Sequence, residues 1–281
     1  MFYREYPPPP ALKDHIQCFW ALEHDYRDPS HTHEHLWADT HIELIFSYGE
    51  RYGRQIDGAR TALPANFVIG PFRKELLLYS DGLTGFVAVR FHPWGFAAFS
   101  TMKMTGLINT ILPAEDLLKE FPNLSMQTAD GPGEGSQVNV KLDILGNWLM
   151  RRLEEQPEKK TSVPVIARAI EAEKGRVKIA ELAAAFGINP RKLERLFMSE
   201  IGMSAKLFAR ILRFSHAKGL IERDPDISLA GLTYETGYAD QAHFSHNFRE
   251  MFGYTPAQFK AMMRGWKEKM APDVVFLQDK P

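Results

Sequence analysis

The stretch SLAGLTYETGYADQAHFSHNFREMFGYTPAQF, residues 228–259, decides the fold of the C-terminal half of this chain. It repeats the pattern of KIAELAAAFGINPRKLERLFMSEIGMSAKLF, residues 178–208, at an offset of 50 residues before the turn and 51 after it. In each copy a glycine separates two segments whose apolar residues recur at helical spacing. Neither copy is long enough to bury a core alone, so we expect two helix-turn-helix units joined by a connecting helix at 210–221.

The turn of each unit is specified by its residues. Gly187 and Gly237 stand where a tight turn between helices needs a left-handed backbone, which glycine adopts without the Cβ penalty. Asn189 and Asp240 follow as candidate N-caps. Pro190 suits the first position of a helix, because its missing N–H needs no partner there. We therefore expect the second helices to begin close to residues 190 and 241.

The second helix of each unit has a buried apolar stripe and a polar outer face. The expected stripes are Leu193, Leu196, Phe197 and Ile201 in the first helix, and Phe244, Phe248 and Phe252 in the second. The outer faces carry arginine, glutamine and glutamate, which can bond guanine, adenine and the cytosine amino group respectively. This chemistry is suited to reading the edges of bases.

Residues 163–264 resemble the DNA-binding domain of the AraC/XylS family of transcription regulators, above all in GYADQAHFSHNFREMFGYTP at 237–256. The resemblance implies that the two second helices enter neighbouring major-groove segments, about 34 Å apart on one face of double-stranded DNA. It implies base contacts from the first helix, with Lys192 near phosphate, and corresponding contacts from the second. The candidate DNA-binding residues are Arg191, Lys192, Glu194, Arg195, Gln241, Ala242, His243 and His246.

Three positions depart from the family pattern. Ala205 stands where proline is usual, and Thr233 where alanine is usual. His246 stands where arginine is frequent, and a neutral imidazole offers a single donor or acceptor in place of a fork. We therefore expect weaker guanine recognition by the second unit, with His246 acting mainly on phosphate.

Length and composition are those of an ordinary two-domain globular protein. The chain has 281 residues, of which 44% are hydrophobic and 25% are charged. Residues 161–281 carry 18 Lys and Arg against 14 Asp and Glu, whereas residues 1–160 carry 16 against 21. The N-terminus lacks an apolar export signal, no stretch is long and apolar enough to span a membrane, and the single Cys18 cannot form an internal disulfide. We expect a cytoplasmic protein without membrane contact.

The fold class that these patterns predict is α+β with two domains. Residues 1–125 contain short apolar runs separated by turn residues, at 42–49, 66–72, 74–80 and 85–91, which indicate a β-barrel or sandwich. Flanking helices are expected at 94–102 and 114–121. Residues 126–162 comprise a loop, an interdomain or dimerisation helix and a linker. The helix has Val140, Ile144, Trp148 and Leu149 on one face. The DNA-binding domain follows at 163–265, with a tail at 266–281.

The N-terminal domain resembles, more weakly, the β-barrel sensor modules that precede this DNA-binding domain, which implies a cupin-like effector domain. Aromatic bulk with a few polar groups is typical of a small-ligand site, and equally of a packed core. We name Trp37, His41, Glu43, Arg90 and His92 as candidate effector-binding residues. Cys18, in an apolar QCFW setting, is interpreted as a buried core thiol.

Histidines are concentrated in SHTHEHLWADTHIELIF, residues 30–46. If 31–35 is a strand, His31, His33 and His35 share one face, which suits either metal chelation or a solvated polar face. We prefer the solvated face, and predict no metal, no cofactor and no catalytic residue.

Three functions fit these patterns. The first is a transcription regulator that responds to a small-molecule effector, with double-stranded DNA as partner, RNA polymerase as a further partner and a homodimer as its assembly. The second is a cupin-like metal-dependent enzyme fused to a DNA-binding domain. The third is a constitutive DNA-binding regulator whose N-terminal domain serves only to dimerise. The sequence favours the first.

Overall fold

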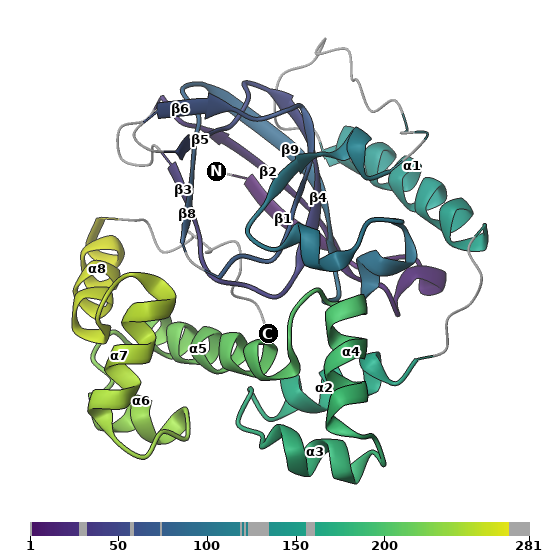
Figure 1. Cartoon of the computed structure of the whole chain (residues 1–281). Coiled ribbons are helices and arrows are strands. Elements are labelled where there is room, and N and C mark those ends of the chain that lie inside the picture. Colours follow the sequence, from purple (N-terminus) through teal and green to yellow (C-terminus); the bar gives the residue numbers. More distant parts are fainter. Residues whose placement is uncertain are drawn as a thin grey trace. The chain divides into compact units, whose positions relative to one another are not determined.

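The computed structural model describes residues 2–27, 33–56, 59–73, 75–118, 120, 122, 135–155 and 161–269. The chain forms two compact units (Figure 1). The N-terminal unit comprises Met1–His35, His41–Pro71 and Leu76–Thr161. The C-terminal unit comprises Ser162–Pro281 together with Leu36–Thr40 and Phe72–Glu75. Two short segments from the N-terminal half of the sequence are therefore grouped with the helices.

A six-stranded antiparallel sheet is the larger layer of the N-terminal unit. Its strand order is β1-β2-β9-β4-β7-β10, so that strands distant in sequence become neighbours at its centre. The middle stretches of the central strands are buried on both faces and are mostly apolar. The strands are β1 (Phe2–Tyr6), β2 (Ile16–Asp25), β4 (Ile42–Gly49), β7 (Asn66–Ile69), β9 (Leu83–Phe91) and β10 (Ile111–Pro113).

A second sheet has four strands in the order β3-β8-β5-β6. Together the two sheets confirm the prediction of a β-rich N-terminal domain. The strand pairings of the described residues leave the two sheets separate, so they do not close into one barrel. The strands of this sheet are β3 (His33–Leu36), β5 (Gly53–Ile56), β6 (Ala59–Ala62) and β8 (Leu76–Tyr79).

Helix α1 (Gly135–Glu154) covers one face of the six-stranded sheet. Leu142, Leu145 and Leu149 of the helix pack in one apolar core with strand residues that include Phe19 and Val89. A helix that lies on a sheet needs only one apolar stripe, and these leucines at spacings of three and four supply it. This packing anchors α1 to the sheet.

The sequence prediction for the face of α1 was wrong in part. Trp148 and Leu149 are buried, but Val140 is 59% exposed and Ile144 is 39% exposed. With 3.6 residues per turn, positions 140 and 144 have rotated away from the stripe that contains Leu145 and Leu149. Two apolar side chains of α1 are therefore left on the surface.

The helices expected at 94–102 and 114–121 are shorter than predicted. The structure forms single 3₁₀ turns there, η2 (Gly95–Ala98) and η4 (Ala114–Asp116), besides η1 (Pro10–Leu12) and η3 (Met104–Leu107). The Ser100 hydroxyl accepts a hydrogen bond from the N–H of Met102 and donates to the carbonyl of Leu117. Such bonds between a side chain and the backbone compete with helix continuation.

The C-terminal unit is built from helices, as predicted. The long helix α5 lies at its centre and contacts α2, α4, α6, α7 and α8. Its buried residues include Phe208, Ile211 and Phe214. The helices are α2 (Val163–Ala172), α3 (Ile179–Ala185), α4 (Pro190–Glu200), α5 (Ala205–Arg223), α6 (Leu229–Glu235), α7 (Gln241–Phe252) and α8 (Pro256–Lys269).

An aromatic cluster forms the core around α7 and α8. Phe248 and Phe252 lie with ring centroids 4.7 Å apart, and Phe259 of α8 lies 5.6 Å from Phe248. Trp37, from the segment Leu36–Thr40 of this unit, lies edge-on to Phe259 at 5.1 Å and is only 2% exposed. A residue from early in the chain thus completes the core beneath α7.

Candidate nucleic-acid interface

The first helix-turn-helix unit bends at Gly187. Its φ of +61° is left-handed, and its N–H donates to the carbonyl of Ala184 at 3.0 Å while Ile188 N–H donates to Ala183 at 2.9 Å. These bonds satisfy carbonyls at the end of α3. A Cβ on Gly187 would meet no atom within 4 Å. The glycine is therefore needed for its backbone conformation, not for lack of space.

Helix α4 begins where its residues predict. The side chain of Asn189 accepts a hydrogen bond from the N–H of Arg191 at 2.8 Å, and Pro190 is the first helical residue. An N-cap of this kind supplies an acceptor for one of the free N–H groups of the first turn. Both expectations for this helix start are confirmed.

The buried and exposed faces of α4 are those that the sequence predicts, apart from one residue. Leu193 and Phe197 are fully buried, whereas Leu196 is only half-buried. The residues expected to face outward are exposed: Arg191, Lys192, Glu194, Arg195 and Met198. This face carries three cations and one carboxylate. Among the described residues, none forms a hydrogen bond or an ion pair with the side chain of Arg195.

The second unit repeats this construction. Gly237 has φ of +68°, and its N–H donates to the carbonyl of Tyr234 at 3.0 Å. Asp240 caps α7 by accepting from the N–H of His243 at 2.7 Å. At the other end Gly253 stops the helix with φ of +80°. The capping residue expected from the sequence is confirmed here too.

Helix α7 buries one aromatic stripe and leaves its first turns in solvent. Phe244, Phe248 and Phe252 are almost completely buried. His243 lies edge-on to Tyr238 with centroids 5.1 Å apart, which limits the freedom of its ring. The four candidate DNA-binding residues of this helix are all exposed: Gln241, Ala242, His243 and His246.

Helix α5 sets the separation of the two units. Helices α4 and α7 lie at opposite ends of it, so they do not bury each other (Figure 1). Arg210 of α5 bonds Glu250 of α7 at 2.6 Å. Within α5, the buried Lys218 donates to both carboxylate oxygens of Glu222, at 2.9 and 3.0 Å. The exposed faces of α4 and α7 thus belong to helices that both pack on α5.

In the N-terminal unit, the structure brings together two of the five candidate effector-binding residues. Glu43 and Arg90 are opposite one another on β4 and β9, and Arg90 Nε donates to Glu43 Oε1 at 2.7 Å. Both side chains are less than 10% exposed. Arg90 also lies 5.5 Å from the ring centroid of Trp20. This ion pair thus places two buried charged groups beside an aromatic ring, among mainly apolar side chains of the sheet.

The other three candidates differ in position. Trp37 belongs to the C-terminal unit, where it packs on aromatic rings. His41 is half-buried just before β4. His92 stacks on Trp94 at 4.9 Å, and its Nε2 is 3.2 Å from the carbonyl oxygen of Lys13. Only Trp37 belongs to the other unit, whereas His41 and His92 adjoin the paired residues Ile42 and Phe91, next to Glu43 and Arg90 in the strand register.

Two residues outside the five candidates, Trp20 and Cys18, are neighbours of this ion pair. Trp20 is 2% exposed, and its Nε1 has no hydrogen-bond acceptor within the described part of the chain. Cys18 lies beside Arg90 on β2, where burial raises the pKa of the thiol to about 12. The thiol is thus un-ionised at neutral pH, in line with its reading as a core residue. Because successive side chains of β2 point to opposite faces, Cys18 and Trp20 lie on the same face of the strand. The sequence predicts this shared face once the pairing of the strand is known.

The histidine segment is described only in part, because His31 lies outside the described residues. His33 and His35 share one face of β3, with their Nε2 atoms 3.0 Å apart. Glu34 faces the other way, is 8% exposed and accepts from the hydroxyl of Tyr26 at 2.5 Å. Over the part of the chain that the structure describes, no group of three or more His, Cys, Asp or Glu is placed to hold a metal ion.

Comparison with known proteins matches both halves of the chain. A model described as a helix-turn-helix domain matches residues 182–262, which contain both units described above. Residues 182–262 form an AraC-type helix-turn-helix domain. A second model, a domain of unknown function (DUF6597), matches residues 4–113. The AraC-type domain is therefore joined to a β-rich domain whose family model carries no function.

Curated relatives of the AraC-type domain are transcription regulators. The HTH-type transcriptional regulator GlxA of Rhizobium meliloti (strain 1021) is 36% identical over 92 residues, which are 33% of this chain and 27% of that protein. The arabinose operon regulatory protein of Escherichia coli (strain K12) is 28% identical over 149 residues, 50% of this chain and 49% of that protein. The chain spans half or less of the length of these relatives.

Solved structures with some likeness include ToxT from Vibrio cholerae, with 9% sequence identity and a TM-score of 0.47 over 86% of this chain and 98% of that chain. A probable AraC family transcriptional regulator from Rhodopseudomonas palustris CGA009 is 27% identical, with a TM-score of 0.33 over 37% of this chain and 98% of that chain. No helix of the described residues has the length and apolar character to cross a membrane.

Proposed function

We propose that this protein is a sequence-specific DNA-binding transcription regulator, acting in the cytoplasm and without enzymatic activity. One observation carries the proposal. Two helices, α4 and α7, each begin after a left-handed glycine turn and a side-chain cap, and each exposes polar residues at its N-terminal turns. Helices of this construction place their first residues against base edges in the major groove.

The proposed contacts divide by chemistry. Arg191, Glu194 and Arg195 contact bases from α4, and Lys192 contacts phosphate. From α7, Gln241 bonds adenine, while His246 acts mainly on phosphate because an imidazole cannot bond guanine with a fork. Ala242 and His243 complete the set, an alanine methyl being suited to the methyl group of thymine. The proposed DNA-binding domain is 163–265, preceded by a sensor-like domain at 1–125.

The proposal extends to regulation by a small molecule bound in the N-terminal unit. The buried pair of Glu43 and Arg90 lies beside Trp20, whose Nε1 has no hydrogen-bond partner among the described residues, and offers polar groups within an aromatic setting. Sites for small ligands combine apolar walls with a few such groups. An effector regulates only if its affinity differs between two arrangements of the protein, and such coupling commonly amounts to ~1–3 kcal/mol.

The proposed assembly is a homodimer that recruits or excludes RNA polymerase at a promoter. The exposed Val140 and Ile144 of α1 support a contact between copies, because they are adjacent apolar side chains on one helix face. Sedimentation of the full chain tests this. A monomer at all concentrations, unchanged by Val140→Glu and Ile144→Glu, contradicts the dimer and leaves the DNA-binding proposal intact.

The experiment that tests the main proposal is selection of bound sequences from a random pool of duplex DNA by the purified full chain. We expect a motif with two half-sites about one helical turn apart, and affinity that falls steeply as salt is raised. Recovery of unenriched DNA, or binding insensitive to salt, contradicts the proposal. Thermal shifts of the full chain with pooled small metabolites test the effector separately.

A further inference from the structure

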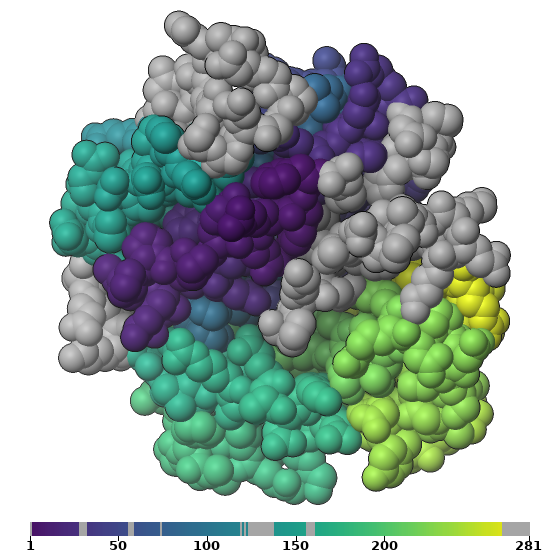
Figure 2. Space-filling model, turned by 180° about the vertical axis from the view of Figure 1, so that it is seen from behind, coloured from purple at the N-terminus to yellow at the C-terminus, as the bar shows by residue number. Residues whose placement is uncertain are grey.

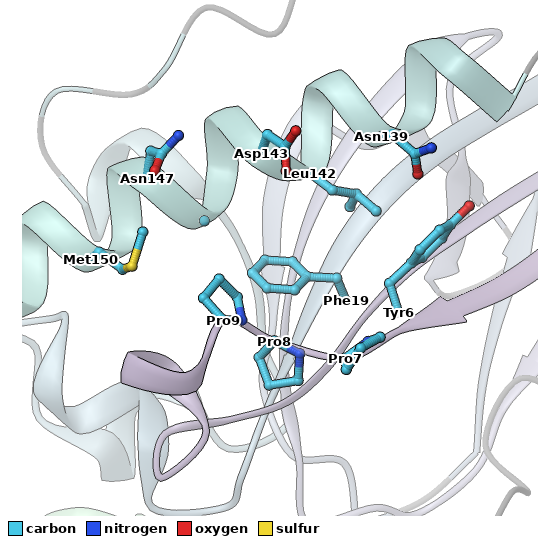
Figure 3. A pocket seen from close by; sticks show the side chains of 11 residues that line it. Tyr6, Pro7, Pro8, Pro9, Phe19, Asn139, Leu142, Asp143, Asn147 and Met150 are labelled. Carbon is cyan, nitrogen blue, oxygen red and sulfur yellow. The ribbon is translucent and has the colours of Figure 1, made fainter.

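The N-terminal segment passes beside α1 (Figure 2), and a groove lies between them (Figure 3). Its volume is about 500 Å³. It lies wholly within the N-terminal unit, and Phe19 of its lining alternates with Cys18 and Trp20 along β2. The groove is therefore on the other face of the sheet from Glu43 and Arg90, and it is independent of the proposed effector site.

The groove has an apolar floor and walls. Phe19 and Leu142 are buried at its base, while Tyr6 and the rings of Pro7, Pro8 and Pro9 form the wall opposite the helix (Figure 3). These are rigid side chains with few rotamers, so the groove is preformed and little conformational entropy is lost when it is filled.

Gly146 lets the proline segment approach α1 closely. A Cβ at this position would come within 3.2 Å of Cγ of Pro9. Glycine inside a helix costs about 0.5–1 kcal/mol relative to alanine, so the helix carries a destabilising residue at the point where the proline segment approaches it. A side chain in its place would press against Pro9.

The proline segment offers hydrogen-bond acceptors only, whereas the asparagine side chains of α1 both donate and accept. Three consecutive prolines have no backbone N–H, so that wall can only accept hydrogen bonds. On α1, Asn139, Asp143 and Asn147 recur every four residues and line the same side of the groove. Asp143 is exposed and supplies the one carboxylate of this lining. The side of the groove formed by α1 thus carries one negative charge beside an apolar, partly aromatic floor.

We propose that this groove binds an organic cation, an amine with a flat or cyclic apolar body. The ammonium group donates to the carboxylate of Asp143 and to the side-chain oxygen of either Asn139 or Asn147, which lie one turn away on either side. The apolar body lies on Phe19 and Leu142 and against the proline rings. The carboxylate of Asp143 selects against an anion of the same shape.

Isothermal titration of the full chain with three probes of one shape tests the proposal: 1-naphthylmethylamine, 1-naphthylmethanol and 1-naphthoate. We expect one equivalent of the amine to bind with a Kd below about 1 mM, with the alcohol at least about tenfold weaker and the carboxylate weaker still. Asp143→Asn keeps the shape and removes the charge, and should weaken the amine at least about tenfold. Asp116→Asn, an exposed carboxylate of the same unit outside the groove, is the matched control and should change nothing.

Equal binding of the three probes, equal effects of Asp143→Asn and Asp116→Asn, or no binding of the amine up to about 5 mM overturns the proposal. Loss of amine binding as the protein self-associates at high concentration shows that a second copy covers the groove, and also overturns it. Circular dichroism melting of each variant confirms that the fold is intact, and no step requires DNA.

Discussion

Arg90 and Glu43 are 47 residues apart in sequence, yet Arg90 Nε donates to Glu43 Oε1 at 2.7 Å in the buried centre of the six-stranded sheet. Both side chains are less than 10% exposed, so water shields these charges little. Removal of one member of such a pair commonly costs about 3–5 kcal/mol, because the remaining charge loses its opposite charge in a buried setting.

This pair gives the first prediction. Arg90→Met and Glu43→Met should each lower the free energy of unfolding of the N-terminal unit by about 3–5 kcal/mol, and the double variant should recover most of that loss. Urea unfolding followed by circular dichroism measures all four proteins. Additive losses in the double variant would show that the two residues act independently.

Gly187 and Gly219 form a matched pair for a test of backbone conformation. A Cβ meets no atom within 4 Å at either position, but Gly187 has φ of +61° whereas Gly219 lies inside α5. Gly187→Ala should destabilise the C-terminal unit by about 1–2 kcal/mol, while Gly219→Ala should stabilise it by about 0.5–1 kcal/mol. Thermal and urea unfolding of the two variants measures the sign of each change in the free energy of unfolding. A change of the same sign in both variants would refute the conformational role of Gly187.

Trp37 should contribute to the stability of the C-terminal unit although it stands early in the sequence. It is 2% exposed and packs on Phe259 and Phe252. Trp37→Ala should lower the free energy of unfolding of this unit by about 3–5 kcal/mol through the cavity that it leaves. Tyr234→Ala, which truncates a ring that is 77% exposed, is the control and should change stability by less than about 0.5 kcal/mol. Hydrogen exchange of the amides of α7 and α8 locates the effect.

Arg195 and Lys192 are adjacent on the exposed face of α4 and separate base recognition from phosphate contact. Arg195→Ala should weaken binding to the selected DNA sequence by about 1–3 kcal/mol and relax base preference in one half-site. Lys192→Ala should weaken binding to selected and random DNA alike and lower the salt slope by about one. Fluorescence anisotropy at several salt concentrations measures both. An equal loss on random DNA for Arg195→Ala would remove it from the base contacts.

Lys141 gives a prediction about pH. It is buried, its Nζ lies 3.4 Å from the ring centroid of Tyr48, and burial lowers the pKa of its ammonium to about 8 against the opposing charge of Glu23. The folded protein therefore releases this proton before the unfolded chain does, so stability should rise with pH from about 8 to the unfolded value near 10.5.

Comparison with Lys141→Met isolates this effect. Between pH 7 and pH 9 the stability of the unmodified protein, relative to Lys141→Met, should rise by about 1 kcal/mol. Urea unfolding at the two pH values provides the measurement. A constant difference would mean that Lys141 keeps its ordinary pKa in the folded state.

The sequence by itself determined the helix-turn-helix units. Gly187, Asn189 and Pro190 act on residues within a few positions of themselves, and the spacing of Phe244, Phe248 and Phe252 reports the buried face of α7 directly. Local backbone preferences and capping bonds depend on near neighbours, so they can be read from the order of residues.

The tertiary structure alone decided the relationships between distant segments. Strand order placed Glu43 opposite Arg90, and packing assigned Trp37 to the helical unit and turned Val140 and Ile144 of α1 towards solvent. It also formed the groove between the proline segment and α1. These outcomes depend on which of several apolar surfaces meet, and that choice is made by burial over the whole unit, which no local pattern of residues records.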